Sequence, residues 1–340
     1  MRAAALLLSA CLVASHADAC TTVAFLGGSA PVFAYNYDFD TGVGHVLVNP
    51  RGMAKISSAA DNPARWQSRF GSVTFVQFGR DHPMSGMNEA GLAVSQMWLD
   101  ESRYEMADAR PAIGVLEWMQ YLLDTSATVE DALARAAAVR IQGGVPLHYA
   151  IADAVGDAAV VEFIDGHLAV RRGKTLPHTA LTNSTYAQSV AFTDQAGGEP
   201  TGLSSLARFT RAAAATRMSP ADPVAHAFAT LAGVAQPGRT RWSIVYHLGD
   251  RTVRWRSQGN AAIRAIDLDA FDLSCRSPLK TVDVHDGGEG DAVRLFGDYD
   301  ATANADLVLR AYAETPFLRG EDPAETGRAA RLADRAFCAE

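Results

Sequence analysis

Short β-branched and apolar runs joined by tight turns recur along the chain, and they constrain its fold more than any other feature. The first two runs, 20–26 and 31–35, are separated by Gly27-Gly28. Later runs are joined through Asp165-Gly166 and through Gly249-Asp250. Turns as short as these connect antiparallel neighbours, because a parallel connection needs a dozen or more residues. The pattern therefore predicts β-hairpins and antiparallel sheets.

The other expected elements follow the same kinds of signal. Strands are predicted at 73–78, 91–98, 147–152, 158–164, 167–171, 179–182, 241–248 and 252–257. Helices are predicted from behind Pro111 to about Leu123, after a cap at Thr128, and at 203–217, 223–235, 303–313 and 324–337. Strands, then helices, then strands, without regular βαβ alternation, indicate an α+β fold with helices packed outside the sheets. The absence of an obvious linker or repeat favours a single domain over 20–340.

The N-terminus has the pattern of a secretory signal peptide. A short apolar run is followed by Ala17-Asp18-Ala19, which has the small-x-small form of a signal peptidase site. We expect a signal peptide at 1–19, a mature chain that begins at Cys20, and a secreted or periplasmic product. A competing interpretation takes Leu8-Ser9-Ala10-Cys11 as a lipoprotein cleavage box and would lipidate that first cysteine.

Composition and charge exclude several classes of partner. The net charge is −8, with 30 Lys and Arg against 38 Asp and Glu and no block of like charges, so we expect no nucleic acid partner. No later run is apolar enough for stable membrane insertion. The Cys and His residues are too scattered for a metal site, and no cofactor is expected.

Cys275 and Cys338 form either a disulfide or two free thiols. A homo-oligomer remains open.

A cysteine at a mature N-terminus combines a thiol with a free α-amine, which titrates near about 7.7–8.0. The amine can act as the general base for the thiol, so no catalytic histidine is needed. The predicted hairpin also folds Asp38 back toward Cys20, where its carboxylate would orient the amine and stabilise its protonated form. The alternatives are a small buried hydrophobic residue at Cys20 and an ordinary turn residue at Asp38.

Six short motifs in order carry a family resemblance. They are Cys20-Thr21-Thr22, Tyr35-Asn36-Tyr37-Asp38, Asn62-Pro63-Ala64-Arg65-Trp66, Gly86-Met87-Asn88-Glu89-Ala90-Gly91-Leu92, Leu181-Thr182-Asn183-Ser184 and Ser204-Ser205-Leu206-Ala207-Arg208-Phe209. From Cys20 to about Ser257 the chain resembles the choloylglycine hydrolase family, which contains penicillin V acylases, bile salt hydrolases and other linear amide hydrolases.

The resemblance implies a four-layer αββα sandwich of the N-terminal-nucleophile hydrolase type. It implies Cys20 as nucleophile and base, and Asp38 as the residue that holds the α-amine. It also implies that Asn183 donates to the oxyanion and that Arg208 steadies the charge around the nucleophile. From the residues alone, Asn183 could instead be a turn residue after a strand, and Arg208 could lie on a solvated helix face.

Two positions depart from the family pattern. Bile salt hydrolases carry an arginine three residues before the aspartate, where this chain has Tyr35, so one cationic contact to the nucleophile is missing or supplied elsewhere. Trp98 ends the strand after the Gly-Leu pair, where many relatives have Asn or Tyr. Its backbone N–H could still serve the oxyanion, while its side chain would narrow the acyl pocket. Both departures bear on substrate identity more than on reaction type.

The expected function is hydrolysis of a linear C–N amide bond through a thioester on Cys20. A small-molecule acyl amide is the expected substrate, such as penicillin V, a conjugated bile salt or an N-acyl homoserine lactone. An acyltransferase would use the same thioester, and a secreted non-enzymatic binding protein is the alternative from another class. A papain-like protease is disfavoured because no histidine partner is supported. His148, His178 and His247 are expected to be structural.

Overall fold

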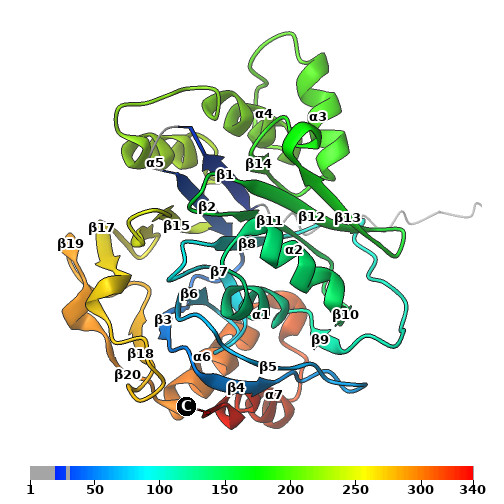
Figure 1. Ribbon diagram of the computed structural model, residues 1–340. Coiled ribbons are helices and arrows are strands. Elements are labelled where there is room, and N and C mark those ends of the chain that lie inside the picture. The colour runs from blue at the N-terminus through cyan, green and yellow to red at the C-terminus, as the bar shows by residue number, and fades with distance from the viewer. Residues whose placement is uncertain (1–19, 28–30, 340) are drawn as a thin grey trace, which may run out of the picture.

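The computed structural model describes residues 20–27 and 31–339, and two large sheets dominate them (Figure 1). Sheet A has seven strands, in the order β14 (Ala180–Leu181), β1 (Thr21–Phe25), β2 (Val32–Asp38), β15 (Thr240–His247), β16 (Thr252–Ser257), β17 (Asn260–Asp267) and β19 (Gly290–Asp291). Sheet B has nine strands, in the order β13 (His167–Arg172), β12 (Ala158–Ile164), β11 (Leu147–Ala152), β8 (Ala93–Trp98), β7 (Pro83–Asn88), β6 (Ser72–Val76), β3 (His45–Asn49), β18 (Lys280–Asp283) and β20 (Gly297–Asp298).

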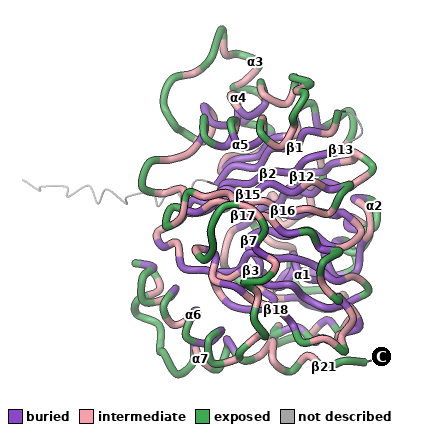
Figure 2. The backbone as a smooth tube through the Cα atoms, turned by 90° about the vertical axis from the view of Figure 1, so that its left-hand side faces the viewer, coloured by how far each residue is buried: buried purple, intermediate pink, exposed green. Residues whose placement is uncertain are grey.

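The central strands of sheet B, β11, β8, β7 and β6, are almost entirely buried, and their alternating side chains separate two cores. On β8, Ala93 and Met97 belong to the core that lies between the two sheets, whereas Val94 belongs to the core beneath the helices. Successive residues of a strand point to opposite faces, so one strand supplies both cores. Figure 2 shows the buried residues concentrated in the strands between the helical layers.

Helices cover the outer face of each sheet. Helices α1 (Trp118–Thr125) and α2 (Val129–Ala138) lie over sheet B, and α4 (Ser205–Ala215) and α5 (Pro223–Gly233) lie over sheet A. Helix α3 (Tyr186–Gln195) packs on α4. The side chain of Thr128 accepts a hydrogen bond from the backbone N–H of Asp131 and so caps α2 as expected. The α+β fold with an αββα layer order is therefore confirmed.

The two sheets are also linked by polar side chains. The hydroxyls of Thr22 on β1 and Ser95 on β8 lie 2.7 Å apart, and so do those of Ser85 on β7 and Tyr246 on β15. All four residues are fully buried. Buried hydroxyls need partners, and here each finds its partner on the opposite sheet.

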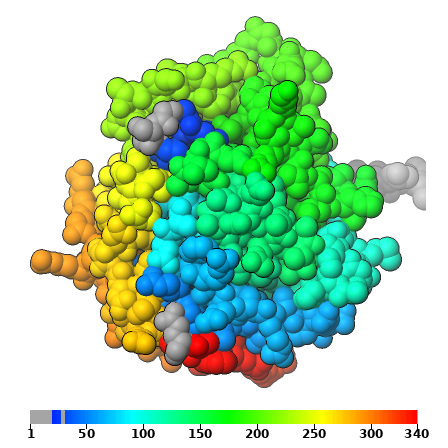
Figure 3. All heavy atoms as spheres, viewed as in Figure 1, coloured from blue at the N-terminus to red at the C-terminus, as the bar shows by residue number. Residues whose placement is uncertain are grey.

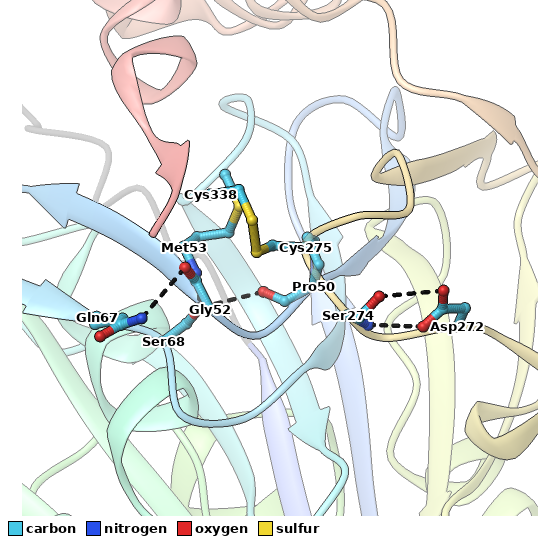
Figure 4. The surroundings of a disulfide bond; sticks show 9 residues. All are labelled: Pro50, Gly52, Met53, Gln67, Ser68, Asp272, Ser274, Cys275 and Cys338. Atoms are coloured by element: carbon cyan, nitrogen blue, oxygen red, sulfur yellow. Dashed lines mark hydrogen bonds between the residues drawn. A yellow bond between two sulfur atoms is a disulfide. The ribbon is translucent and has the colours of Figure 1, made fainter. Parts of the chain in front are cut away.

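The C-terminal segment, defined here as residues 301–339, returns to the start of the chain. It contains α6 (Ala301–Glu314), a 3₁₀ turn (Pro316–Leu318), α7 (Pro323–Ala330) and β21 (Phe337–Cys338). Strand β21 pairs with β4 (Met53–Ile56), which in turn pairs with β5 (Arg65–Gln67). Figure 3 shows the end of the chain packed beneath its early residues. A disulfide joins Cys338 to Cys275, beside Pro50 and Gly52 (Figure 4).

Two helix predictions are wrong at one end. The helix expected behind Pro111 starts only at Trp118, because β9 (Ala112–Gly114) pairs in parallel with β10 (Arg140–Gln142). The last predicted helix stops at Ala330, since the following residues form a 3₁₀ turn (Leu332–Arg335) and then β21. In both places pairing with a distant strand overrides the local helical pattern. The signal peptide predicted at 1–19 and the alternative at Cys11 lie outside the described residues.

Candidate active site

Cys20 lies just before β1, and the β1–β2 hairpin determines its surroundings. Its side chain is only 5% exposed. Strands β1 and β2 form the predicted hairpin, and its register pairs Thr22 with Tyr35. This register brings the Tyr35 hydroxyl to 3.3 Å from the Cys20 Sγ, while the thiol points at the backbone oxygen of Asp38 at 3.7 Å.

The Tyr35 hydroxyl faces two acceptors. It lies 2.9 Å from the backbone oxygen of Gln96, on the opposite sheet, as well as 3.3 Å from the Cys20 Sγ. Burial, and next the negative charge that Cys20 can carry, raise the pKa of Tyr35 well above its usual value. The phenol therefore keeps its single proton at neutral pH and can give it to either acceptor. A neutral donor therefore stands beside the Cys20 thiol.

Arg208 reaches the same place from α4 and is buried, so it does not lie on a solvated helix face. Its Nη1 donates to the Cys20 backbone oxygen and to Thr21 Oγ1, each at 2.6 Å. Its Nη2 donates to Asn183 Oδ1 at 3.0 Å. Burial lowers the pKa of Arg208, and the carboxylate of Asp38 and the thiolate of Cys20 oppose that shift. An arginine pKa starts so high that the guanidinium stays charged.

Asn183 follows β14 and is oriented from both sides. Its Oδ1 accepts from Arg208, and its Nδ2 donates to the backbone oxygen of Trp98 at 3.0 Å. Because the arginine can only donate, it fixes which end of the amide is oxygen. The Nδ2 group carries two protons, and one of them is directed at Trp98. A second proton can therefore face an oxyanion.

Asp38 and Trp98 complete the set of residues expected at the site. Asp38 ends β2 with no exposed surface. Burial lowers the pKa of Arg208 and the negative charge of Asp38 opposes that shift, whereas burial raises the pKa of Tyr35 and the same charge adds to it. Trp98 ends β8 and is half-buried, with its indole Nε1 donating to Asp100 Oδ1 at 2.6 Å. The fold thus brings together residues that lie up to 188 positions apart, the separation of Arg208 from Cys20.

A largely apolar pocket opens beside the thiol and holds about 670 Å³ of empty space, including its mouth. Its lining comprises Cys20, Tyr35, Tyr37, Asp38, Phe39, Phe78, Met84, Gln96, Met97, Trp98, Leu116, Val145, Leu147, Tyr312, Phe317 and Leu318. A concave apolar cavity with a few convergent polar groups is typical of small-molecule sites. A pocket with this apolar lining can accommodate the hydrocarbon part of an acyl group.

Several lining residues were not predicted from the sequence. Gln96 contributes through its backbone oxygen, which no side-chain pattern reveals. Tyr312 and Phe317 come from the C-terminal segment, whose return to β4 depends on long-range pairing. The alternation of β8 could have placed Met97 on the inner face, because Ala93 and Ser95 share that face.

The histidines lie apart from this pocket, since none of the described ones lines it. His148 contacts Glu162 through Nδ1 at 3.3 Å, and His247 contacts Asp250 at 3.4 Å. Between residues 20 and 339, outside the gap at 28–30, no group of three or more His, Cys, Asp or Glu side chains could hold a metal ion. None of the described helices is long and apolar enough to cross a membrane.

Comparison with known proteins places these residues in a family context. The family model for linear amide C–N hydrolases of the choloylglycine hydrolase family matches residues 20–198. A penicillin V acylase of Pectobacterium atrosepticum is 30% identical over 205 residues, which is 53% of this chain and 54% of that protein. The chain thus spans about half the length of this curated relative.

Solved structures extend the similarity. The structure of penicillin V acylase from Agrobacterium tumefaciens matches with a TM-score of 0.72 and 28% identity, covering 83% of this chain and 98% of that one. A conjugated bile acid hydrolase from Clostridium perfringens has a TM-score of 0.65 at 18% identity, covering 81% of this chain and 98% of that one. The second match supports the fold alone.

Proposed function

Because this chain belongs to the choloylglycine hydrolase family of linear amide C–N hydrolases, we propose that it hydrolyses a linear acyl amide through a thioester on Cys20. The observation that carries the proposal is the position of the Cys20 thiol. The thiol lies at an apolar pocket, beside the buried hydroxyl of Tyr35. The backbone oxygen of Cys20 accepts a hydrogen bond from Arg208. The relatives named penicillin V acylase favour an amide with a bulky acyl group.

The proposed reaction requires Cys20 to begin the mature chain. Its α-amine takes the thiol proton, and the thiolate attacks the amide carbonyl carbon. The protonated amine then gives its proton to the leaving nitrogen as the C–N bond breaks. Water, activated by the same amine, attacks the thioester, releases the carboxylic acid and restores the thiol. No further reactant is consumed.

The neighbouring side chains receive distinct roles in this scheme. Asp38 stabilises the protonated α-amine through its charge. Asn183, together with the backbone N–H of Trp98, donates to the oxyanion, and Arg208 fixes the orientation of the Asn183 amide. Tyr35 donates to the thiolate in place of a cation. The catalytic residues proposed from the sequence therefore remain the proposed set.

We also propose export of the protein, with cleavage after Ala19. The disulfide between Cys275 and Cys338 supports this, because such bonds persist in oxidising compartments. The expected result is an intact mass that corresponds to a chain starting at Cys20. Mass spectrometry of the protein recovered from the periplasm or the medium measures it. A diacylated chain starting at Cys11 would contradict both the cleavage site and the mechanism.

One extra, non-removable residue ahead of Cys20 tests the mechanism. This change turns the α-amine into an amide nitrogen that cannot act as a base, while the thiol and the pocket are retained. We expect kcat/KM for a phenoxyacetyl amide to fall by about 10²–10⁴, the usual contribution of a positioned general base.

The matched control is the Cys20→Ser variant with a free N-terminus. It keeps the amine but replaces the thiol by a weaker nucleophile, so it is also impaired. Equal circular dichroism and thermal unfolding of the three proteins establish that all are folded. If the blocked protein is as fast as the unblocked one, with its extra residue verified by mass, the N-terminal-nucleophile mechanism is wrong.

A further inference from the structure

The C-terminal segment forms one wall of the pocket beside Cys20. Three of its residues, Tyr312, Phe317 and Leu318, line that pocket. The segment lies beyond residues 20–198, the part that the family model matches. The wall is therefore contributed by a part of this chain for which that match assigns no role.

The two aromatic residues of the wall, Phe317 and Tyr312, contact aromatic rings from other parts of the molecule. The Phe317 ring meets the Trp98 ring edge to face at 6.2 Å and the Phe39 ring at 6.3 Å. Tyr312 meets Phe78 edge to face at 5.9 Å, and Phe78 meets Phe39 at 5.8 Å. Edge-to-face pairs at these separations are favourable. The five rings form a continuous arc around the pocket.

The wall is held in place by several independent contacts. Asn304, in α6, accepts a hydrogen bond from the backbone N–H of Arg80 at 2.8 Å. The Tyr299 hydroxyl donates to Asp334 at 2.8 Å, and Glu314 contacts Thr41. The disulfide to Cys275 fixes the end of the segment. A wall anchored at this many points presents its side chains in a defined position.

Phe317 is nevertheless 45% exposed, although it lies in an otherwise apolar lining. A large acyl group that leads outward from the Cys20 thiol would cover part of this ring and remove it from water. An acetyl group carries a single methyl group beyond its carbonyl and so offers far less apolar surface to this wall than a phenoxyacetyl group does. Contact with the wall would therefore distinguish amides by the size of their acyl group.

We propose that Phe317 and Tyr312 determine specificity: they form a C-terminal wall that selects amides with a bulky apolar acyl group over those with a small one. This inference rests on the proposed amidase function. The residues act by binding the acyl group and take no part in proton transfer. Replacing them should therefore change substrate binding and leave the reactivity of the Cys20 thiol as it is.

The test compares two anilides of the same aniline, one phenoxyacetyl and one acetyl. In the Phe317→Ala variant, we expect kcat/KM for the phenoxyacetyl anilide to fall about 10-fold, mainly through a higher KM. The value for the acetyl anilide stays the same. The Tyr312→Phe variant keeps its ring and so retains the selectivity of the unchanged protein. Phe337→Ala is the matched control, since Phe337 lies in the same segment, is 64% exposed and does not line the pocket.

A binding measurement separates this inference from the proposed function. The Cys20→Ala variant lacks the nucleophile but keeps the wall, and phenoxyacetic acid is the probe, followed by titration calorimetry. Adding Phe317→Ala should weaken its affinity about 10-fold, whereas adding Phe337→Ala should not. If the unchanged enzyme hydrolyses neither anilide, the proposed function fails and the binding result still decides the role of the wall. Equal effects on both acyl groups, or unchanged binding, would overturn the proposal.

Discussion

At the scale of single residues, Tyr35 is the most informative departure from the family pattern. A cation beside a thiolate would stabilise it by charge, whereas a phenol does so only through a directed hydrogen bond. The Tyr35 hydroxyl lies 3.3 Å from the Cys20 Sγ and 2.9 Å from the Gln96 oxygen, and both acceptors compete for one proton. A thiolate accepts a hydrogen bond more strongly than the Gln96 carbonyl does. The Tyr35 O–H should therefore turn from Gln96 toward the Cys20 sulfur when the thiolate forms.

The Tyr35→Phe variant tests this contact. Loss of the donor leaves the thiolate less stabilised, so the pKa of Cys20 should rise and thiol alkylation should reach its plateau at a higher pH. The rate of iodoacetamide modification between pH 6 and 10 measures the shift. Tyr186→Phe is the control, because the hydroxyl of this buried tyrosine donates to the backbone oxygen of His178 and not to the thiol. An identical alkylation profile in the Tyr35→Phe variant would rule out the proposed contact.

The residues around Cys20 also show how much of the site could be predicted from the sequence. Cys20, Asp38 and Tyr35 are neighbours through one hairpin, whose glycine-containing turn and two flanking apolar runs are local signals in the sequence. Arg208 and Asn183 were associated with Cys20 only through the family resemblance, because no local rule joins residues so distant. The hydrogen bond from Asn183 to the Trp98 oxygen involves a backbone acceptor, which carries no residue-type signal.

At the scale of elements, a buried charge cluster connects β4 and α1 with the turn before β7. Lys55 Nζ lies 2.8 Å from Asp81 and 2.9 Å from Asp124. Burial lowers the pKa of Lys55, but the two carboxylates outweigh it and leave that pKa raised. Burial raises the pKa of Asp124 more than the lysine lowers it, whereas Lys55 and Arg80 keep the pKa of Asp81 below its usual value despite burial.

Replacement of Lys55 by Met should be strongly destabilising. Two buried carboxylates lose their shared cation, and breaking a buried ion pair from one side costs about 3–5 kcal/mol in the free energy of unfolding. The pKa of Asp124, already raised by burial, then rises further above that of the unfolded chain because Lys55 no longer opposes the shift. The protonated form of Asp124 is compatible with the fold below the unfolded pKa, and the corresponding stability is lost as pH rises through the raised pKa. Urea unfolding should therefore show a larger deficit at pH 8 than at pH 4.

Lys280→Met is the matched control for this prediction. Lys280 pairs with Asp298, but both side chains are substantially exposed, at 35% and 66%. An exposed pair contributes about 0–1 kcal/mol, so this variant should unfold almost as the unchanged protein does. Similar losses in the two lysine variants would contradict the importance given to burial.

Two of the wrongly predicted element boundaries share one cause. The sequence patterns located the hairpins and the capped helix α2, since caps and turns are local signals. They misplaced the start of α1 and the end of α7, where β9 and β21 pair with strands remote in sequence. Helix α3 was missed although Thr185 and Gln188 form a capping box at its start. That last signal was present in the sequence.

At the scale of the whole molecule, the disulfide closes the chain upon itself. Cys275 and Cys338 are 63 residues apart, and a loop of that length restricts the unfolded chain by about 4 kcal/mol. The Cys338→Ser variant should therefore lower the free energy of unfolding by up to that amount, measured by urea denaturation. A reducing agent should reproduce the loss in the unchanged protein and have no effect on the variant. Coincident unfolding curves with and without the reductant would show that the crosslink does not stabilise the fold.

The buried hydroxyl pairs between the two sheets affect how precisely one sheet is aligned on the other. Apolar contacts are non-directional, so they define the alignment of two packed sheets less sharply than hydrogen bonds do. Hydrogen bonds of 2.7 Å require defined positions of both partners, and Thr22–Ser95 and Ser85–Tyr246 both span the interface. Thr22 lies two residues after Cys20, and Ser95 lies next to Gln96. The two pairs thus fix the position of strand β1, which follows Cys20, relative to strand β8 on the facing sheet.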